Sequence, residues 1–192
     1  MPRPIEYNRD EVLKKAMRLF WSLGYEQTSV RDVLDATGFN RHSLYEEFGG
    51  KDGLFKAVLE FYKENIAQQV ISPLTKKESD IETLRAIFKE RAAHDQTQLG
   101  CLFTNTANIK QCLDGELFQL TKAYNRKVEK AFQTCITHAQ EKGQVPNNKD
   151  ARLLARFVST VFHGLSPMSK LGITKNETLA FGDMTIDAIL AA

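Results

Sequence analysis

The feature that most constrains this chain is a pair of very short helix patterns joined by a glycine turn near the N-terminus. Thr28-Ser29 can cap the first helix, and Gly38 gives the backbone the freedom for a tight turn after it. Asn40 can then cap the second helix. The apolar residues expected in the core of the pair are Val30, Val33, Leu34, Leu44 and Phe48. An enzyme has no evident reason to place a glycine turn between two such short capped helices.

An amphipathic helix precedes this pair. Asn8 followed by Glu11 fits a capping box. Apolar residues then recur at helical spacing until Gly24, at Val12, Ala16, Leu19, Phe20 and Leu23. Two short helices packed on such a helix form the arrangement that presents a helix N-terminus to the major groove of DNA. We therefore predict a helix-turn-helix at about residues 28–48.

The rest of the chain predicts further helices and no sheet. Lys51-Asp52 begins a long helix, which Pro73 and the polar stretch 75–80 interrupt. Turn signals divide the remainder into helices near 80–94, 102–111, 116–142, 150–170 and 176–191. We expect an all-α protein.

Composition excludes several other classes of protein. The chain is 42% hydrophobic and 26% charged, as in soluble globular proteins, and no apolar run approaches the roughly 20 residues of a membrane span. The first residues lack the apolar stretch of a secretory signal, so we expect a cytoplasmic protein. The three cysteines, Cys101, Cys112 and Cys135, suit reduced thiols better than a disulfide framework.

Charge and known motifs narrow the function further. Residues 1–56 contain nine Lys/Arg and nine Asp/Glu, so DNA binding must depend on the local placement of charge. No Gly-x-Ser-x-Gly, His-Glu-x-x-His or glycine-rich phosphate loop appears, so we expect no enzymatic activity. The four histidines show no close metal-ligand spacing, and we expect no metal and no cofactor.

The segment from Thr28 to Phe55, TSVRDVLDATGFNRHSLYEEFGGKDGLF, resembles the N-terminal signature of the TetR/AcrR family. The matching positions, in order, are Thr28-Ser29-Val30, Ala36-Thr37-Gly38-Phe39, Leu44-Tyr45, Phe48 and Lys51-Asp52-Gly53-Leu54. The match covers about the first 60 residues, and helix order and length support the remainder. The resemblance implies a homodimeric, one-component transcription regulator that binds a DNA operator.

Helix starts are the first candidate DNA contacts. Thr28, Ser29 and Asn40 can offer hydroxyls and backbone N–H groups to phosphates, because helix N-termini attract anions. Arg31 could contact a phosphate or a base from the preceding helix. The alternative for Thr28, Ser29 and Asn40 is that they are plain helix caps.

The second short helix carries the other candidate contacts. Arg41 and His42 lie in its first turn, where side chains reach base edges, and Arg is the usual reader of guanine. Tyr45 and Lys51 occupy positions that contact phosphate in the family that the segment resembles. Tyr45 could instead be a core aromatic residue with an exposed hydroxyl.

The helix near 150–170 has an apolar stripe wider than its own core requires, at Leu153, Leu154, Phe157, Val158, Val161, Phe162 and Leu165. The helix near 176–191 adds Leu179, Phe181, Met184, Ile186, Ile189 and Leu190. In the family, the two equivalent helices of each subunit form a four-helix dimer interface. We therefore expect a homodimer through these helices; the alternative is that the stripe is intramolecular core.

The resemblance also implies a ligand pocket enclosed by the central helices. Aromatic walls with a few polar groups suit a small organic ligand, so the candidate lining residues are Phe88, Cys101, Phe103, Asn105, Tyr124, Phe157, Phe162 and His163. Ordinary packing is the alternative for most of them. Cys101 lies in a sequence that resembles a Gly-Cys-Leu sequence of many relatives, some of which sense electrophiles or oxidants through cysteine. Its apolar neighbours favour a buried, inert thiol.

These inferences combine into one expectation. We expect a helix-turn-helix DNA-binding domain over 1–52 and a helical ligand-binding and dimerisation domain over 53–192. The expected function is repression from a palindromic double-stranded operator, relieved by an unknown small organic effector. The alternatives are a thiol-based redox or electrophile sensor using Cys101, and an architectural DNA-binding protein without a ligand.

Overall fold

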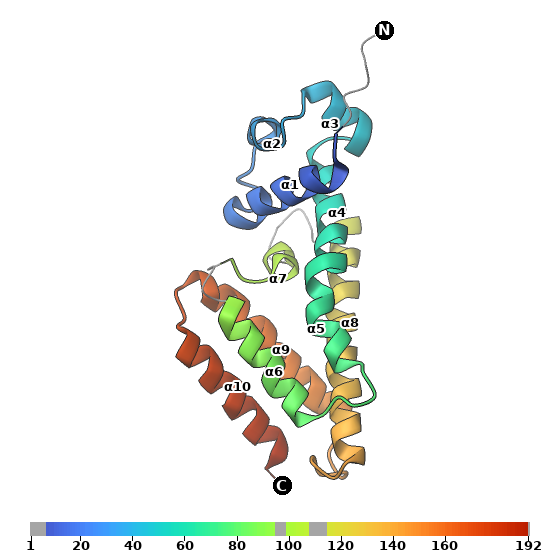
Figure 1. Ribbon diagram of the computed structural model, residues 1–192, viewed down its shortest axis with the longest axis vertical. Helices are drawn as coiled ribbons and strands as arrows, with labels where there is room; N and C mark the ends of the chain where they lie inside the picture. The colour runs from blue at the N-terminus through green and yellow to red at the C-terminus, as the bar shows by residue number, and fades with distance from the viewer. Residues whose placement is uncertain (1–6, 95–98, 108–114, 192) are drawn as a thin grey trace. The chain divides into compact units, whose positions relative to one another are not determined.

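The computed structural model describes residues 7–94, 99–107 and 115–191, and the described residues form helices without a strand (Figure 1). The predicted all-α class is confirmed. The chain divides into two compact units, of which the first ends at Asn65 and the second begins at Ile66.

Four helices make up the first unit: α1 (Arg9–Leu23), α2 (Val30–Thr37), α3 (Arg41–Phe48) and α4 (Lys51–Tyr62). Helix α1 packs against α2 and α4, and α3 packs against α4. The expected domain boundary between residues 52 and 53 therefore falls inside α4, which packs along its length within the first unit.

Local capping signals define the ends of these short helices. The side chains of Asn8, Ser29 and Asn40 cap the starts of α1, α2 and α3. Gly38 and Gly49 end α2 and α3 with φ angles of 80° and 74°, a left-handed conformation that glycine adopts without a Cβ penalty. The helix boundaries near the turn thus follow from single residues.

An aromatic cluster holds the core of the first unit together. The ring centroid of Phe55 lies 4.9 Å from that of Phe20 and 4.7 Å from that of Tyr25, and all three side chains are buried. Val33 and Leu44 anchor α2 and α3 in the same core and are fully buried. Burying each such side chain contributes about 1.5–3 kcal/mol.

The predicted long helix after Lys51 is not a continuous α-helix. Helix α4 is followed by a π-helical turn, η1 (Lys63–Ala67), and then by α5 (Gln68–Leu74). Pro73, which was expected to interrupt the helix, lies inside the last turn of α5, one residue before its end. A π-helical turn has no simple sequence signature, so the prediction missed it.

The second unit continues with α6 (Ile81–His94), α7 (Leu102–Ala107), α8 (Glu116–Glu141), α9 (Ala151–Lys170) and α10 (Lys175–Leu190). The predicted bounds of α6, α8, α9 and α10 are confirmed to within a residue. The helix predicted over 102–111 is described as α7, and its last four predicted positions lie outside the described residues.

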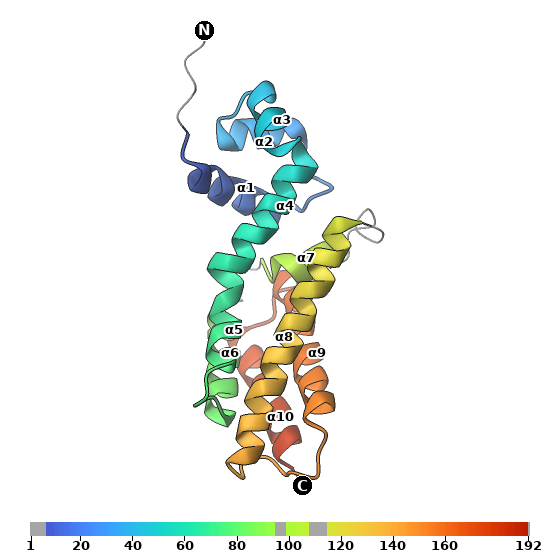
Figure 2. The ribbon, with the colours of Figure 1, turned by 90° about the vertical axis from the view of Figure 1, so that its right-hand side faces the viewer.

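Two pairs of helices dominate the packing of this unit. Helix α8 lies along α9 (Figure 2), and α6 lies along α10 (Figure 1). Gly182 lets α10 approach α6, because a Cβ at this position would lie 2.7 Å from Cβ of Phe88. Within the described ranges, no helix has the length and apolar character needed to cross a membrane.

Candidate functional site

The first turn of α3 presents two exposed side chains at the surface of the first unit. Leu44 is fully buried and fixes the orientation of the helix, whereas Arg41 and His42 point into solvent. The Arg41 guanidinium lies 5.8 Å from the ring centroid of Tyr45, and Nε2 of His42 lies 3.5 Å from a carboxylate oxygen of Glu46. The leading turn of α3 therefore offers hydrogen-bond donors to a partner.

The starts of α2 and α3 are capped by exposed side chains. Oγ of Ser29 accepts the backbone N–H of Asp32 at 3.1 Å, and the Asp32 carboxylate accepts the Ser29 N–H at 2.8 Å. Hydrogen bonds from the Ser29 side chain and backbone lower the pKa of Asp32. Oδ1 of Asn40 accepts the Ser43 N–H at 2.9 Å.

Thr28 differs from these caps because it is buried. Its hydroxyl donates to the carbonyl oxygen of Gly24 at 2.7 Å, which closes the loop between α1 and α2. Its side chain stabilises the loop, and Ser29 is the residue that caps α2.

Lys51 joins the start of α4 to the same loop. Its Nζ donates to the carbonyl oxygens of Tyr25 at 3.0 Å and Thr28 at 2.9 Å, and lies 4.2 Å from the ring centroid of Tyr25. An ammonium group has three donors, and two of them are directed at these carbonyls. The charge of Lys51 is therefore held in one place beside the start of α2.

Two further predicted contacts lie on the surface. Tyr45 is half-exposed, and its ring edge lies 3.1 Å from where a Cβ of residue Gly50 would be. Nε of Arg31 lies 3.8 Å from a carboxylate oxygen of Asp35, and the Arg31 side chain is 90% exposed. Such an exposed ion pair contributes only about 0–1 kcal/mol, so Arg31 can exchange it for another anion at little cost.

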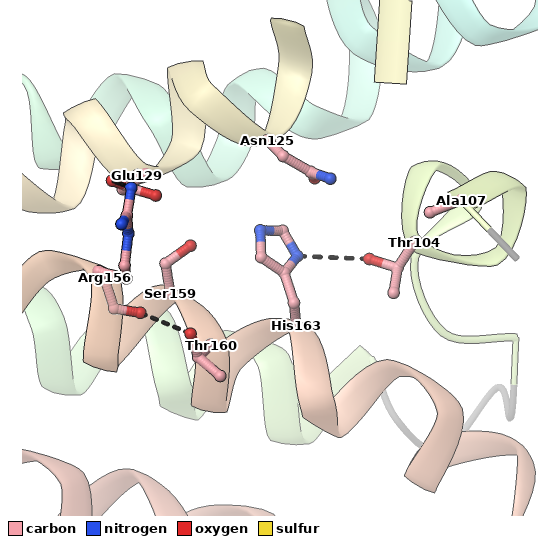
Figure 3. A pocket seen from close by; sticks show the side chains of 8 residues that line it. All are labelled: Thr104, Ala107, Asn125, Glu129, Arg156, Ser159, Thr160 and His163. Carbon is pink, nitrogen blue, oxygen red and sulfur yellow. Dashed lines mark hydrogen bonds and ion pairs between the residues drawn. The ribbon is translucent and has the colours of Figure 1, made fainter. Parts of the chain in front are cut away.

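The second unit contains a cavity of about 370 Å³ among α7, α8 and α9, called here the body cavity (Figure 3). Seven of its eight lining residues have polar side chains, and the lining consists of Thr104, Ala107, Asn125, Glu129, Arg156, Ser159, Thr160 and His163. Arg156 and Glu129 form an ion pair of 3.2 Å in this lining.

His163 is the titratable group deepest in the cavity wall. Its Nδ1 lies 3.3 Å from the hydroxyl of Thr104. Burial, and then the nearby positive charge of Arg91, lower the pKa of His163 to about 4, so the ring is neutral at pH 7. Within the described part of the chain, the buried atoms Nε2 of His163 and Oδ1 of Asn125 have no hydrogen-bond partner.

His163 is the one predicted ligand residue that lines the body cavity. Four of the other predicted residues are buried aromatics: Phe103 and Tyr124 stack with centroids 4.0 Å apart, and Phe88 packs edge-on against Phe162 at 5.8 Å. Burial, followed by the neighbouring Cys101, raises the pKa of Tyr124 well above its usual value. These aromatic residues form the packed interior beside the cavity.

The three remaining predicted residues also lie elsewhere. The backbone N–H of Cys101 donates to Oγ of Ser166 at 2.6 Å, and the side chain of Cys101 is buried. The Asn105 amide donates to the carbonyl oxygen of Leu99 at 2.9 Å. Phe157 is exposed on α9.

Sequence reasoning missed seven cavity residues because it searched for aromatic walls. The missed signal is a polar stripe at helical spacing on α9, made by Arg156, Ser159, Thr160 and His163. Asn125 and Glu129 form a matching i, i+4 pair on α8. Polar residues that interrupt an amphipathic pattern at one face were the clue to this cavity.

Helices α9 and α10 carry exposed apolar side chains, called here the apolar face. Its members are Leu153, Phe157, Met168, Leu171, Phe181 and Met184. Leu153 and Leu171 are 65% and 78% exposed. From the predicted stripe, Val158, Phe162 and Leu165 are buried instead. The stripe is therefore partly core and partly surface.

The structure describes two of the three cysteines. Cys101 and Cys135 are both buried, and burial raises the pKa of the Cys135 thiol to about 11. Cys112 lies outside the described residues. Over the described ranges, no group of three or more His, Cys, Asp or Glu side chains could hold a metal ion.

Comparison with known proteins gives matches over both units. Residues 12–58 match the family model described as bacterial regulatory proteins, tetR family, and residues 80–180 match the model described as tetracyclin repressor-like, C-terminal domain. The HTH-type transcriptional repressor ComR of Escherichia coli (strain K12) is 30% identical over 188 residues, which cover 96% of this chain and 90% of ComR. The repressor BdcR of the same strain is 28% identical over 189 residues, covering 97% and 91%.

Solved structures agree with these matches. A cysteine mutant of the TetR family transcriptional regulator CifR, complexed with 26bp double-strand operator DNA, has a TM-score of 0.87 and 27% identity to this chain. The match covers 97% of this chain and 99% of CifR.

Proposed function

Because this chain belongs to the TetR family of bacterial regulatory proteins, we propose that it is a homodimeric cytoplasmic repressor that leaves a palindromic operator when a small organic effector binds. Members of this family are DNA-binding transcription factors and not enzymes. The observation that carries the proposal is the leading turn of α3, where Arg41 and His42 are exposed above a fully buried Leu44. CifR, which has a similar structure, is complexed with operator DNA.

The candidate contacts divide into two kinds. Arg41 and His42 can reach base edges, because the N-terminal residues of a recognition helix enter the major groove. Ser29, Asn40, Tyr45 and Lys51 lie at helix starts or beside them, where phosphates bind. Arg31 can exchange Asp35 for a phosphate or a base. For buried Thr28, the contact would come through its backbone.

Two substitutions test this division on an operator recovered from a random DNA pool. Arg41→Ala should relax the sequence preference, at a cost of about 1–3 kcal/mol on the preferred site. Lys51→Ala should weaken binding to all sequences alike and reduce the salt slope of log K by about 0.9 for the lost phosphate contact. Because Lys51 also bonds two carbonyls, an unchanged salt slope with lowered stability would assign it a purely structural role.

The apolar face supports a dimer. Leu153, Phe157 and Met168 lie on one side of α9, since their spacing keeps them within about 60° at 100° per residue, and Leu171 follows at the end of the helix. Several large apolar side chains exposed on two helices are typical of protein interfaces. Two copies also place two recognition helices on half-sites about 34–36 Å apart, which multiplies affinity.

Charge substitutions on the apolar face test the dimer. The variant Leu153→Glu with Met184→Glu should sediment as a monomer, because each buried carboxylate would lack a partner. The matched control is Leu23→Glu, which changes a half-exposed leucine in the first unit and should leave the sedimentation coefficient unchanged. A dimer that survives both face substitutions refutes this interface.

The body cavity supports effector control. A ligand-free architectural protein needs no cavity of about 370 Å³ in its body, whereas a sensor does. An effector that favours the non-binding shape by about 1.4 kcal/mol changes operator occupancy tenfold, which is within typical coupling energies. The thiol-sensor alternative gains no support from buried Cys101.

A further inference from the structure

Two residues that line the body cavity from different helices each have a buried polar atom without a hydrogen-bond partner. Nε2 of His163 on α9 and Oδ1 of Asn125 on α8 are inaccessible to solvent and lack hydrogen-bond partners among the described residues. Figure 3 shows the imidazole and the carboxamide pointing into the same space. Buried side-chain polar atoms are nearly always hydrogen-bonded, and each exception calls for a missing partner.

The charges around the cavity show which kind of partner fits. Among the described residues of its lining, Glu129 and Arg156 carry charges, and they neutralise each other in an ion pair. The His163 ring is neutral, since burial lowers its pKa to about 4. A charged ligand would therefore lose its hydration without meeting an uncompensated opposite charge in the lining.

The positive charge of Arg91 acts on His163, and the Arg91 guanidinium has contacts of its own. Its Nη2 donates to Oγ of Ser169 at 3.1 Å, and its guanidinium lies 5.6 Å from the ring centroid of Phe162. Arg91 is not part of the cavity lining. An anion in the cavity would thus have no direct contact with this charge.

We propose that the body cavity binds a small uncharged molecule that carries a hydrogen-bond donor next to an acceptor, as a carboxamide does. The donor bonds Oδ1 of Asn125, and the complementary group bonds Nε2 of His163. In this pairing the hydroxyl of Thr104 donates to Nδ1 of His163, so that the ring proton lies on Nε2 and is donated to the acceptor of the ligand. The volume of about 370 Å³ is near the lower end for ligand pockets, so the molecule is small. This assignment rests on the proposed effector response, because it names the effector class.

Benzamide and benzoate are matched probes for this proposal, because they share a ring and differ in charge. We expect full-length protein to bind benzamide about tenfold more tightly than benzoate in calorimetric titrations. Asn125→Leu and His163→Leu should each weaken benzamide binding by about tenfold. The control His138→Leu removes a histidine that bonds Ser79 outside the cavity, and benzamide binding should not change.

Each alternative result overturns the assignment. Tighter binding of benzoate would make the cavity an anion site, and absent benzamide binding would refute the class of ligand. Equal benzamide binding by the cavity variants and wild type would place the site elsewhere. If a variant unfolds, the ¹⁵N chemical shift of His163 Nε2 is measured in the wild-type protein instead. The proposal requires benzamide to change this shift, and an unchanged shift refutes it.

Operator binding separates this proposal from the proposed function. Benzamide that binds at His163 without releasing operator DNA would leave the site intact and refute its role as effector site. If the ligand-free protein binds no DNA from the random pool, repression is refuted. The benzamide titrations would still test which ligand the cavity binds.

Discussion

Ser29 in the first unit and Thr174 in the second form the same capping box, each with an acid three residues later. In the first unit, the box starts a helix of 8 residues, and caps and C-terminal glycines set nearly the whole length of α2 and α3. In the second unit, the box starts a helix of 16 residues, whose position depends on the faces that it buries against α6 and α9. Local capping thus determines the helices of the candidate DNA-binding surface, and long-range packing determines the position of α10 in the second unit.

We expect the largest loss of stability from Gly53→Ala, which changes a residue of the first unit. A Cβ on Gly53 would overlap the backbone carbonyl oxygen of Phe48, an atom that cannot rotate away. The cost should reach or exceed the roughly 3 kcal/mol upper range of overpacking, and operator binding should be lost in a mobility-shift titration. Gly115→Ala, which meets nothing within 4 Å, is the matched control in the second unit. Wild-type operator affinity in Gly53→Ala would contradict the close approach of α4 to the carbonyl oxygen of Phe48.

Acid should destabilise the second unit through His163. The folded pKa is about 4 against an unfolded value of 6.5, so between these values the unfolded chain binds a proton that the folded chain excludes. The free energy of unfolding should fall by roughly 3 kcal/mol as the pH drops from about 6.5 to about 4. Urea unfolding at several pH values checks this. His163→Gln should lose that part of the pH dependence, and identical slopes for both proteins would disprove the assignment.

Gly182→Ala applies the glycine substitution to the second unit. The added Cβ would lie 2.7 Å from Cβ of Phe88, so α10 must move away from α6 at a cost of about 1–3 kcal/mol. Thermal unfolding measures this loss. Phe88→Gly removes the Cβ and Cγ that the new methyl group would meet, so the double variant should lose less stability than the sum of the two single variants. An additive loss would show that the contact is not the cause.

The loss of one helix cap in each unit should have the smallest effect on stability. Ser29→Ala and Thr174→Ala remove matched caps, and each should cost about 1 kcal/mol in urea unfolding. Operator affinity should fall in Ser29→Ala, because Ser29 begins the helix before α3, and should remain unchanged in Thr174→Ala. Equal losses of affinity in both variants would remove the distinction between the units.

The sequence predicted the fold of the first unit well for a physical reason. Asn40 caps the start of a helix, and Gly38 and Gly49 end helices, each through contacts with residues a few positions away. Such effects can be predicted from a short stretch of sequence. The caps expected at Asn8 and Ser29 are confirmed in the same way. The double role of Lys51 was not predictable, because its bonds to Tyr25 and Thr28 span more than 20 residues of sequence.

The cavity residues were harder to predict because they depend on which helix faces meet. His163 was identified, whereas Phe103 and Tyr124 stack on each other beside the cavity. An aromatic side chain at helical spacing fits a core and a ligand wall equally well. Only the packing of α7 and α9 against α8 shows that Asn125 and not Tyr124 faces the space.

The two side chains at the start of α3 have a consequence for how this protein can change. The contacts described for Arg41 and His42 stay within their own helix, with Tyr45 and Glu46. Replacing them therefore costs little folding energy, whereas replacing Gly53 or Leu44 below them costs much. If Arg41 and His42 read the operator as proposed, new operator preferences can arise by mutation at these two surface positions while the rest of the protein remains folded.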